Sequence, residues 1–234
     1  MRILIVAATG FELLPFTRFL EEKFVRSGEY TFQKGAVQVS VLITGVGITM
    51  TTYALARLFP FQRFDLAINA GIAGAFHREP SLGDVVEVSA DTMGDLGVEE
   101  RDGRFASVFS LGLCDPNLAP FTDGWLHNPD REGLAFLPKV SGITVHKVHG
   151  SEERIREVRE LYHADVETME SAAFFYVCLQ EKIPFLAIRS ISNYVEPRNR
   201  EAWNISLAIE NLNQVLIGII QGFSGGIKEE KEPG

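Results

Sequence analysis

Short apolar runs alternate along the chain with longer stretches whose apolar residues recur every three or four positions. The short runs predict strands at residues 2–8, 30–34, 37–44, 64–70, 84–88, 140–148, 165–167 and 185–191. The longer stretches predict helices at residues 12–26, 47–59, 151–162 and 171–180, and a last helix with an apolar stripe at Ile205, Ile209, Leu212, Leu216 and Ile219. Strands that alternate with helices indicate an α/β fold.

The pattern also predicts a mixed sheet within one domain. Gly35 separates two adjacent strand-forming runs, which is typical of an antiparallel hairpin. The chain has 234 residues, 46% of them apolar, which suits one domain with a large core. We therefore expect a single domain at residues 1–223 and a charged, disordered tail at residues 224–234.

Charge and composition favour a small-molecule ligand. The formal net charge is −9, so no basic surface is expected to bind nucleic acid or an anionic membrane. The apolar run at residues 215–220 falls well short of the roughly 20 residues that cross a bilayer. Cys114 and Cys178 lie far apart without metal-ligand spacing, which is typical of reduced, packed thiols in a cytoplasmic protein.

Acidic residues are crowded where the strand at residues 165–167 meets the next helix. Glu170 lies beside Met169, Phe174 and Phe175, where a carboxylate must find a partner or shift its pKa. One interpretation is a helix-start acid, favoured by the positive end of the helix dipole. The other is a carboxylate, held ionised by that dipole, that binds the hydroxyl groups of a polar ligand.

Two further polar residues follow predicted strands at their carboxyl ends, where open α/β sheets bind ligands. Glu12 follows the first strand, and Asn193 follows the strand at residues 185–191. Each also has a structural interpretation, as a helix-start acid and as a turn-capping amide. The small residues at positions 69–76 predict either a turn that offers backbone N–H groups to a ligand or an ordinary glycine turn.

Three other features have simpler interpretations. Gly45 and Gly47 are too few for a dinucleotide-binding fingerprint and predict a tight turn. His146 and His149 have no third ligand at a suitable spacing, so we expect no metal site. Residues 112–138 lack periodicity and predict a surface loop, of the kind that forms lids or oligomer contacts.

Several segments together resemble the purine nucleoside phosphorylase and methylthioadenosine nucleosidase superfamily. They are Glu12 after the first strand and residues 69–76, 83–86, 169–173 and 189–193, in that order. Within the superfamily, residues 94–97, 166–170 and 191–199 resemble the futalosine hydrolases of the alternative menaquinone route. The resemblance implies a three-layer αβα fold with a mixed central sheet, and a pocket in which Glu12, Glu170 and Asn193 meet.

The resemblance also implies roles in N-glycosidic cleavage, which develops positive charge on the ribose and negative charge on the departing purine. Glu12 is expected to deprotonate the attacking water, and Glu170 to accept hydrogen bonds from the ribose hydroxyl groups. Asn193 replaces the aspartic acid of adenosine-directed relatives, and its amide suits N7 and O6 of hypoxanthine. Substrate contacts are expected at Gly71, Ile72, Ala73, Gly74, Val145, His146, Thr168 and Met169, without a cofactor.

Other functions within the same resemblance stay open. A purine nucleoside phosphorylase needs arginine and backbone donors around phosphate. The first loop carries Glu12 and no arginine, and Arg78 has no assigned place. A methylthioadenosine/S-adenosylhomocysteine nucleosidase is disfavoured by Asn193 and by Val145, which falls near the base-stacking phenylalanine of those enzymes. A non-catalytic nucleoside-binding protein is a further alternative.

Two expectations concern contacts rather than chemistry. Arg189 is expected to form a structural ion pair with Glu167 or Glu170. Superfamily likeness implies a homo-oligomer, a dimer or larger, in which a neighbouring subunit completes the substrate mouth.

Overall fold

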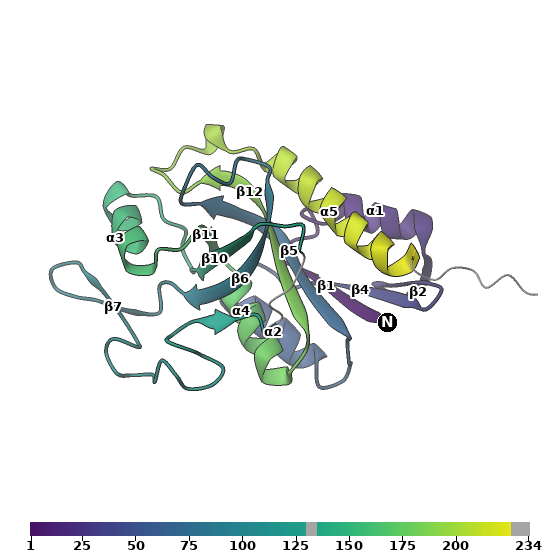
Figure 1. Ribbon diagram of the computed structural model, residues 1–234, viewed down its shortest axis with the longest axis horizontal. Coiled ribbons are helices and arrows are strands. Elements are labelled where there is room, and N and C mark those ends of the chain that lie inside the picture. The colour runs from purple at the N-terminus through teal and green to yellow at the C-terminus, as the bar shows by residue number, and fades with distance from the viewer. Residues whose placement is uncertain (130–134, 226–234) are drawn as a thin grey trace, which may run out of the picture.

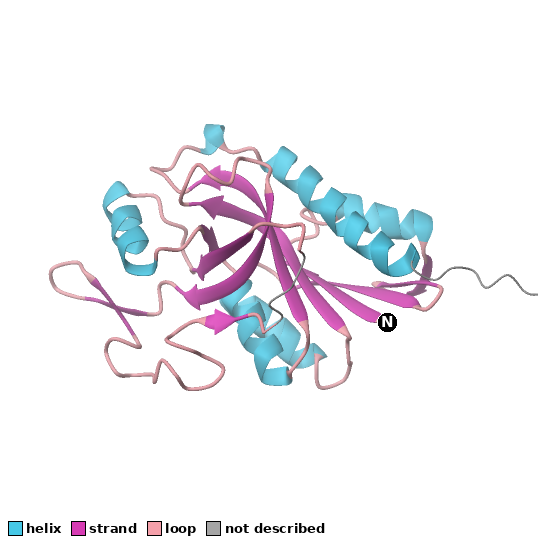
Figure 2. Cartoon of the chain, viewed as in Figure 1, coloured by secondary structure: helices cyan, strands magenta, loops and turns pink. Residues whose placement is uncertain are grey.

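The computed structural model describes residues 1–129 and 135–225. A ten-stranded mixed sheet runs through the molecule, and helices cover both of its faces (Figures 1 and 2). On one face lie α1 (Leu14–Lys23) and α5 (Ile205–Gly225), and on the other lie α2 (Ile48–Leu58) and α4 (Ser171–Glu181). The predicted three-layer fold with a mixed sheet is therefore confirmed.

The main path of the sheet has the order β2-β3-β4-β1-β5-β12-β6-β10-β11. The strands are β1 (Arg2–Ala7), β2 (Val25–Gly28), β3 (Thr31–Lys34), β4 (Val37–Ile43), β5 (Leu66–Ala75), β6 (Val85–Met93), β10 (Lys139–Thr144), β11 (Val166–Thr168) and β12 (Phe185–Tyr194), with β9 (Leu126–His127) paired to β6. As predicted, β3 and β4 form an antiparallel hairpin around Gly35. β1 runs parallel to β4 and β5, and β12 runs parallel to β5 but antiparallel to β6.

The sheet closes on itself at the end that includes β11. This strand pairs with β10 and also, antiparallel, with β5, so that β5, β12, β6, β10 and β11 form a ring. Closure leaves these strands without an open edge. It also brings three strand ends together, because Gly74 on β5 pairs with Glu167 on β11 and with Asn193 on β12.

The residues of β1 show why both faces of the sheet are covered. Ile3 and Ile5 pack in the cluster that includes α1 and α5, whereas Leu4 and Val6 pack in the cluster that includes α2 and α4. A strand buried on both faces has apolar residues at every position, which is the pattern of this segment. Helices on both sides follow from that pattern.

Several predicted boundaries were wrong. The strand predicted at residues 84–88 continues to Met93, and the strand predicted at residues 140–148 ends at Thr144. The first helix ends at Lys23, and the chain then forms β2 instead of continuing as helix to residue 26. Residues 69–76, predicted as a glycine turn, extend β5 to Ala75, because β12 and β11 pair with them. For the same reason β12 continues to Tyr194, and Asn193 lies within a strand rather than after it.

Two glycines of β5 let other side chains approach the strand closely. A Cβ atom at Gly71 would lie 3.1 Å from Oε1 of Glu12. A Cβ atom at Gly74 would lie 2.9 Å from Cγ2 of Val195 and 3.1 Å from Nδ2 of Asn193. Glycine within a strand commonly marks such a close approach.

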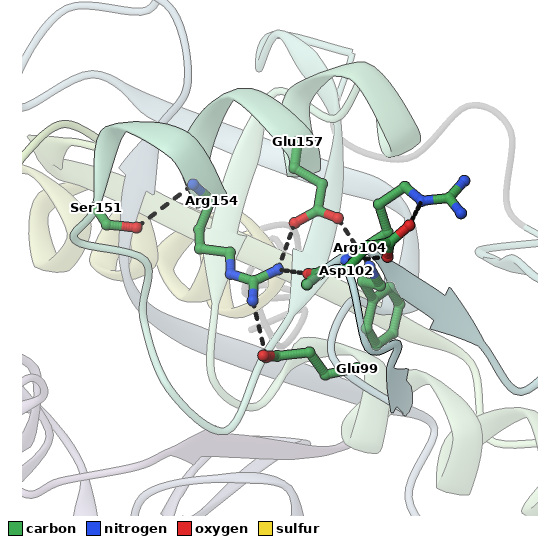
Figure 3. Close-up of polar contacts among 8 residues, drawn as sticks. Glu99, Asp102, Arg104, Ser151, Arg154 and Glu157 are labelled. Carbon is green, nitrogen blue, oxygen red and sulfur yellow. Dashed lines mark hydrogen bonds and ion pairs between the residues drawn. The ribbon is translucent and has the colours of Figure 1, made fainter.

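A separate hairpin of β7 (Gly97–Glu99) and β8 (Phe105–Ser107) was not predicted. Arg154 on α3 (Glu152–Tyr162) holds it by pairing with Glu99 at 2.8 Å and by donating to the carbonyl of Gly103 (Figure 3). Arg154 also pairs with Glu157 at 2.8 Å within the helix. Ser151 accepts a hydrogen bond from the backbone N–H of Arg154 and so caps this helix.

Two predicted segments lie partly outside the described residues. The surface loop at residues 112–138 contains β9, and residues 130–134 of this loop lie outside the described residues. Within the loop, Trp125 packs edge-on against Tyr162. Helix α5 continues to Gly225, so residues 224 and 225 are helical, and the remainder of the predicted tail lies outside the described residues. No helix in the described part of the chain is long and apolar enough to cross a bilayer.

Candidate functional site

Glu12 lies in the loop between β1 and α1, and its carboxylate reaches β5. Oε2 accepts hydrogen bonds from N and Oγ1 of Thr9, at 3.0 and 2.9 Å, and Oε1 accepts one from N of Ile72 at 3.3 Å. Its backbone carbonyl accepts a hydrogen bond from Nδ2 of Asn213 on α5, at 2.8 Å. These contacts fix the orientation of a carboxylate in a residue that is 9% exposed.

Glu170 lies where two helices begin. It is the N-cap residue of α4, and its Oε1 accepts a hydrogen bond from N of Gly47, the N-cap residue of α2, at 2.9 Å. Gly45 and Gly47 have φ values of 89° and 95°, which suit glycine, so the predicted tight turn is confirmed. Helix N-termini favour negative charge, and two of them lie at this carboxylate.

Arg189 on β12 lies on the same side of β5 as Glu12, beside Gly71, and is 1% exposed. Its guanidinium donates to O of Asn69 at 2.9 Å, to Oδ1 of the same residue and to Oγ of Ser171 at 2.7 Å. The predicted ion-pair contact with Glu167 or Glu170 was wrong, because Asn69 and Ser171 accept these hydrogen bonds instead.

The charges of these groups act on one another through space. Burial raises the pKa of Glu170 above its ordinary value, while the charge of Arg189 and the N–H of Gly47 oppose the rise. The negative charge of Glu12 raises the pKa of Glu170 further. Burial lowers the pKa of Arg189, and the carboxylates of Glu170, Glu12 and Asp91 counteract this. The helix dipole predicted to keep Glu170 ionised is therefore opposed by burial.

Asp91 on β6 is a third carboxyl group near Arg189, and burial raises its pKa to about 7. Oγ1 of Thr144 donates to Oδ1 of Asp91 at 2.8 Å, whereas Oδ2 has no hydrogen-bond partner in the described part of the chain. The same hydroxyl lies 3.0 Å from Oγ1 of Thr168 and accepts a hydrogen bond from N of Ala172. This network connects Asp91 to the first turn of α4.

Asn193 lies farther along the sheet, over Gly74. Its Oδ1 accepts a hydrogen bond from Oγ of Ser192 at 2.8 Å, and its Nδ2 donates to O of Tyr194 at 3.1 Å. One amide hydrogen is therefore engaged, and one is left for a ligand. Asn193 lines a small cleft together with Gly74, Val148, His149, Glu167, Tyr194, Val195, Glu196, Arg198 and Trp203.

The structure thus brings Glu12 and Glu170 together around Arg189, and it places Asn193 in a cleft whose lining includes neither glutamate. On β5, Gly71 lies beside Glu12 and Arg189, and Gly74 lies beside Asn193. The two glycines are three positions apart on the strand, which corresponds to about 10 Å.

The other predicted contact residues differ in their access to the cleft. Val145 is fully buried in a cluster with Phe76 and Val158, and the residues of this segment that line the cleft beside Asn193 are Val148 and His149. Thr168 is buried in the hydrogen-bond network of Asp91. Ile72 contributes its backbone N–H to Glu12. Ala73 is buried in the core, and Met169 lies between β11 and α4. His146 is exposed and binds Asp95 through its N and Nδ1.

Sequence reasoning missed His149 and Glu167 as site residues. N of His149 donates to Oε1 of Glu167 at 3.1 Å, and Nδ1 of its ring contacts Oε2. The pairing depends on where β11 lies relative to the segment after β10, which no local pattern specifies. Within the described residues, no group of three or more His, Cys, Asp or Glu could hold a metal ion.

Arg78, which had no predicted place, lies at the surface. Its guanidinium pairs with Glu196 at 2.8 Å and lies 4.1 Å from the centre of the Tyr194 ring. A larger cleft lies beside α3 and is lined by His77, Arg156, Arg159, His163, Val195 and Pro197 among others. That cleft contains none of the predicted catalytic residues.

Comparison with known proteins assigns the family. A model of the phosphorylase superfamily matches residues 2–221. The chain belongs to the phosphorylase superfamily. Similar members of the superfamily include a futalosine hydrolase from Streptomyces coelicolor, which is 32% identical over 154 residues, covering 65% of this chain and 64% of that protein. A 5'-methylthioadenosine/S-adenosylhomocysteine nucleosidase from Bacillus subtilis is 30% identical over 175 residues, covering 71% of each chain.

Solved structures of the superfamily share the fold. The 5'-methylthioadenosine/S-adenosylhomocysteine nucleosidase of Neisseria meningitidis, in complex with methylthio-immucillin-A, has a TM-score of 0.76 at 18% identity and covers 94% of this chain and 99% of its own. The futalosine hydrolase of Helicobacter pylori has a TM-score of 0.75 at 13% identity, with coverage of 95% and 98%. At these identities the likeness concerns the fold alone.

Proposed function

We propose that the chain is a purine nucleoside N-ribohydrolase that cleaves futalosine to hypoxanthine and dehypoxanthine futalosine, in the futalosine route of menaquinone biosynthesis. The observation that carries the proposal is the Glu12 carboxylate, fixed by Thr9 and Ile72 beside a second carboxylate, Glu170. The similar proteins named futalosine hydrolase and 5'-methylthioadenosine/S-adenosylhomocysteine nucleosidase support the reaction class.

In the proposed reaction Glu12 orients the attacking water and accepts its proton, a role that needs a fixed carboxylate with spare acceptor capacity. Glu170 accepts hydrogen bonds from the ribose hydroxyl groups and stabilises the positive charge that develops on the sugar. Arg189 is a positioning residue, because it acts on both carboxylates while its hydrogen bonds go to Asn69 and Ser171.

The proposed sugar-binding and base-binding groups lie at different positions along β5. The two glutamates act near Gly71, and Asn193 lies at Gly74, about 10 Å farther along the strand. In the proposed complex the ribose lies at the two glutamates and the purine lies at Asn193. Glycine at position 74 lets the side chain of Asn193 approach the strand closely, because a Cβ atom there would lie 3.1 Å from its Nδ2.

Asn193 favours a 6-oxopurine. Its remaining amide hydrogen can donate to O6 of hypoxanthine, whereas the 6-amino group of adenine offers no acceptor at that position. A site built to donate a hydrogen bond discriminates strongly against a ligand that cannot accept it.

A second candidate is a methylthioadenosine/S-adenosylhomocysteine nucleosidase, favoured by the match to the Bacillus subtilis protein. A phosphorylase is less well supported, since Arg189 is enclosed by Asn69 and Ser171, and Arg78 pairs with Glu196 at the surface.

The test is to incubate the purified chain with futalosine, inosine or methylthioadenosine in phosphate-free buffer and to measure the free base by chromatography. We expect hypoxanthine from futalosine. Release that requires added phosphate would identify a phosphorylase, and faster cleavage of methylthioadenosine would identify the second candidate. Binding of futalosine without release of base would identify a nucleoside-binding protein.

A further inference from the structure

The cleft that contains Asn193 holds a second polar group, which the proposed reaction leaves unused. His149 follows β10 and lies against Glu167 on β11, which contacts both its N and its Nδ1. The side chain of Glu167 is 3% exposed and that of His149 is 15% exposed. Within the described residues, Nε2 of His149 has no hydrogen-bond partner, so this nitrogen is available to a molecule in the cleft.

The strand pairing puts His149 and Asn193 at the same place. Gly74 pairs with Glu167 on one side and with Asn193 on the other, and both His149 and Asn193 line the cleft at this point. A purine that accepts a hydrogen bond from Asn193 therefore lies within the cleft that His149 also borders.

Glycosidic cleavage needs a proton donor at this position. The departing purine takes up the electron pair of the broken bond, and protonation of a ring nitrogen neutralises it. The amide of Asn193 gives a hydrogen bond but no proton, and one of its two hydrogens already goes to Tyr194. Histidine is the side chain best suited to donate a proton near neutral pH.

From this arrangement we infer that His149 is the general acid that protonates the departing purine, and that Glu167 positions its ring. The inference rests on the proposed function. As the bond between C1' and N9 breaks, its electron pair passes into the purine, N7 takes the proton from Nε2 of His149, and Asn193 donates to O6. Water adds to C1', and its proton passes to Glu12 and then to solvent. His149 regains a proton from solvent.

Glu167 is suited to this positioning role. A buried carboxylate on Nδ1 keeps a proton on that nitrogen and stabilises the imidazolium, in the way that an aspartate orients the histidine of a hydrolase triad. Other charges also act on the ring: Glu196 and Arg198 line the cleft, and Glu157 on α3 interacts with His149 electrostatically.

The test is the pH dependence of kcat/KM for futalosine in the wild type and in His149→Gln. If His149 is the acid, wild-type activity falls as rising pH removes its proton, and His149→Gln lowers kcat/KM by at least about 100-fold and abolishes this basic limb. A variant that retains the basic limb, or most of the activity, overturns the inference. If the wild-type protein releases no base from futalosine, the proposed function itself is wrong. That outcome is seen before any variant is compared, so it is distinct from a failure of the inference on His149.

A second variant covers the case in which His149→Gln does not fold. Glu167→Gln keeps the shape of the side chain and removes its charge, so the basic limb should move to lower pH. If the basic limb of the pH profile does not move, Glu167 does not position His149, and the assignment of His149 as the general acid is overturned as well. His163→Asn is the matched control, because His163 is exposed at the end of α3 with φ of 48°, a conformation that asparagine accepts. This control should keep the wild-type profile, and thermal melts of all variants verify folding.

Discussion

At the scale of single residues, each of three carboxyl groups has a distinct environment around one buried arginine. Glu12 is held by neutral donors, Glu170 lies at two helix N-termini, and Asp91 is buried with one oxygen unpartnered. Carboxyl groups in different environments take different proton affinities, and this is how one site provides different roles. Three predictions follow from individual side chains.

Replacing Glu12 by glutamine should remove the general base while leaving substrate binding intact. Glu12→Gln retains the shape of the side chain and can still accept the hydrogen bond from Ile72, so we expect the Kd for futalosine to change little. Turnover should fall at least about 100-fold, the usual scale for a general base. Single-turnover kinetics and calorimetric titration measure the two quantities. Equal losses of affinity and turnover would indicate that Glu12 is structural.

Replacing Asn193 by aspartic acid should change the preferred base. A protonated carboxyl group can donate a proton to an adenine ring, whereas an ionised one repels the O6 of hypoxanthine. We expect Asn193→Asp to lower hypoxanthine release from futalosine by at least about tenfold and to improve relative activity on methylthioadenosine. Competition assays with both nucleosides measure the ratio. An unchanged ratio would remove Asn193 from base recognition.

Asp91 should make stability depend on pH. Its folded pKa of about 7 lies above its ordinary value of 3.8, so the folded chain binds this proton in a range where the unfolded chain releases it. The resulting stabilisation is complete below about pH 4 and is lost as the pH rises to about 7.

Asp91→Asn cannot ionise, so its free energy of unfolding relative to the wild type should increase across that range, by at most about 1.4 kcal/mol per pH unit. Urea denaturation at several pH values tests this. The exposed Asp123→Asn, at a residue with φ of 50°, is the control. A difference between Asp91→Asn and the wild type that is constant with pH would contradict the prediction.

At the scale of elements, α5 supports the loop that carries Glu12. Asn213 donates to the carbonyl of Glu12 and to its own helix at Ile209, and its Oδ1 accepts from N of Phe16 on α1 at 2.9 Å. The side-chain amide of Asn213, which is 1% exposed, therefore connects two helices and the backbone of Glu12. The position of Glu12 depends on packing between elements about 200 residues apart in the chain.

Asn213→Ala leaves the buried N–H of Phe16 and the carbonyl of Glu12 without this partner. We expect a loss of about 1–3 kcal/mol in the free energy of unfolding and a lower kcat, because Glu12 loses its fixed orientation. Gln214→Ala on the exposed side of the same helix should change neither. Denaturant unfolding and steady-state kinetics compare them, and a kcat for Asn213→Ala equal to that of the control would contradict the link to Glu12.

At the scale of the whole molecule, apolar side chains are exposed around α2. Met50 is 55% exposed, Tyr53 is 62% exposed, and Phe61 just beyond the helix is 86% exposed. Clustered exposed apolar residues are typical of protein contact surfaces. The helix begins at Gly47, which binds Glu170, so a contact here would border the candidate site.

The homo-oligomer implied by superfamily likeness stays a prediction. Light scattering should give at least twice the mass of one chain, and Tyr53→Glu should reduce it, because burying an unpaired charge in an apolar contact is costly. A monomer at all concentrations would contradict the prediction. A mass that Tyr53→Glu leaves unchanged would place the contact elsewhere.

The sequence by itself determined the elements and most of the candidate chemistry. Short apolar runs such as residues 2–8 predicted strands, and helical spacing predicted the helices, because burial imposes these periods locally. The neighbourhoods of Glu12 and Glu170 were also predicted, since strand ends and helix starts are local features.

Tertiary structure decided which residues meet. The pairing of β11 with β5 extended the strands through Gly74 and Asn193 and brought Glu167 beside them. Arg189 bonded to Asn69, 120 positions away, and His149 to Glu167, 18 positions away. Such contacts depend on how the sheet closes in space, and no local period along the chain specifies that closure.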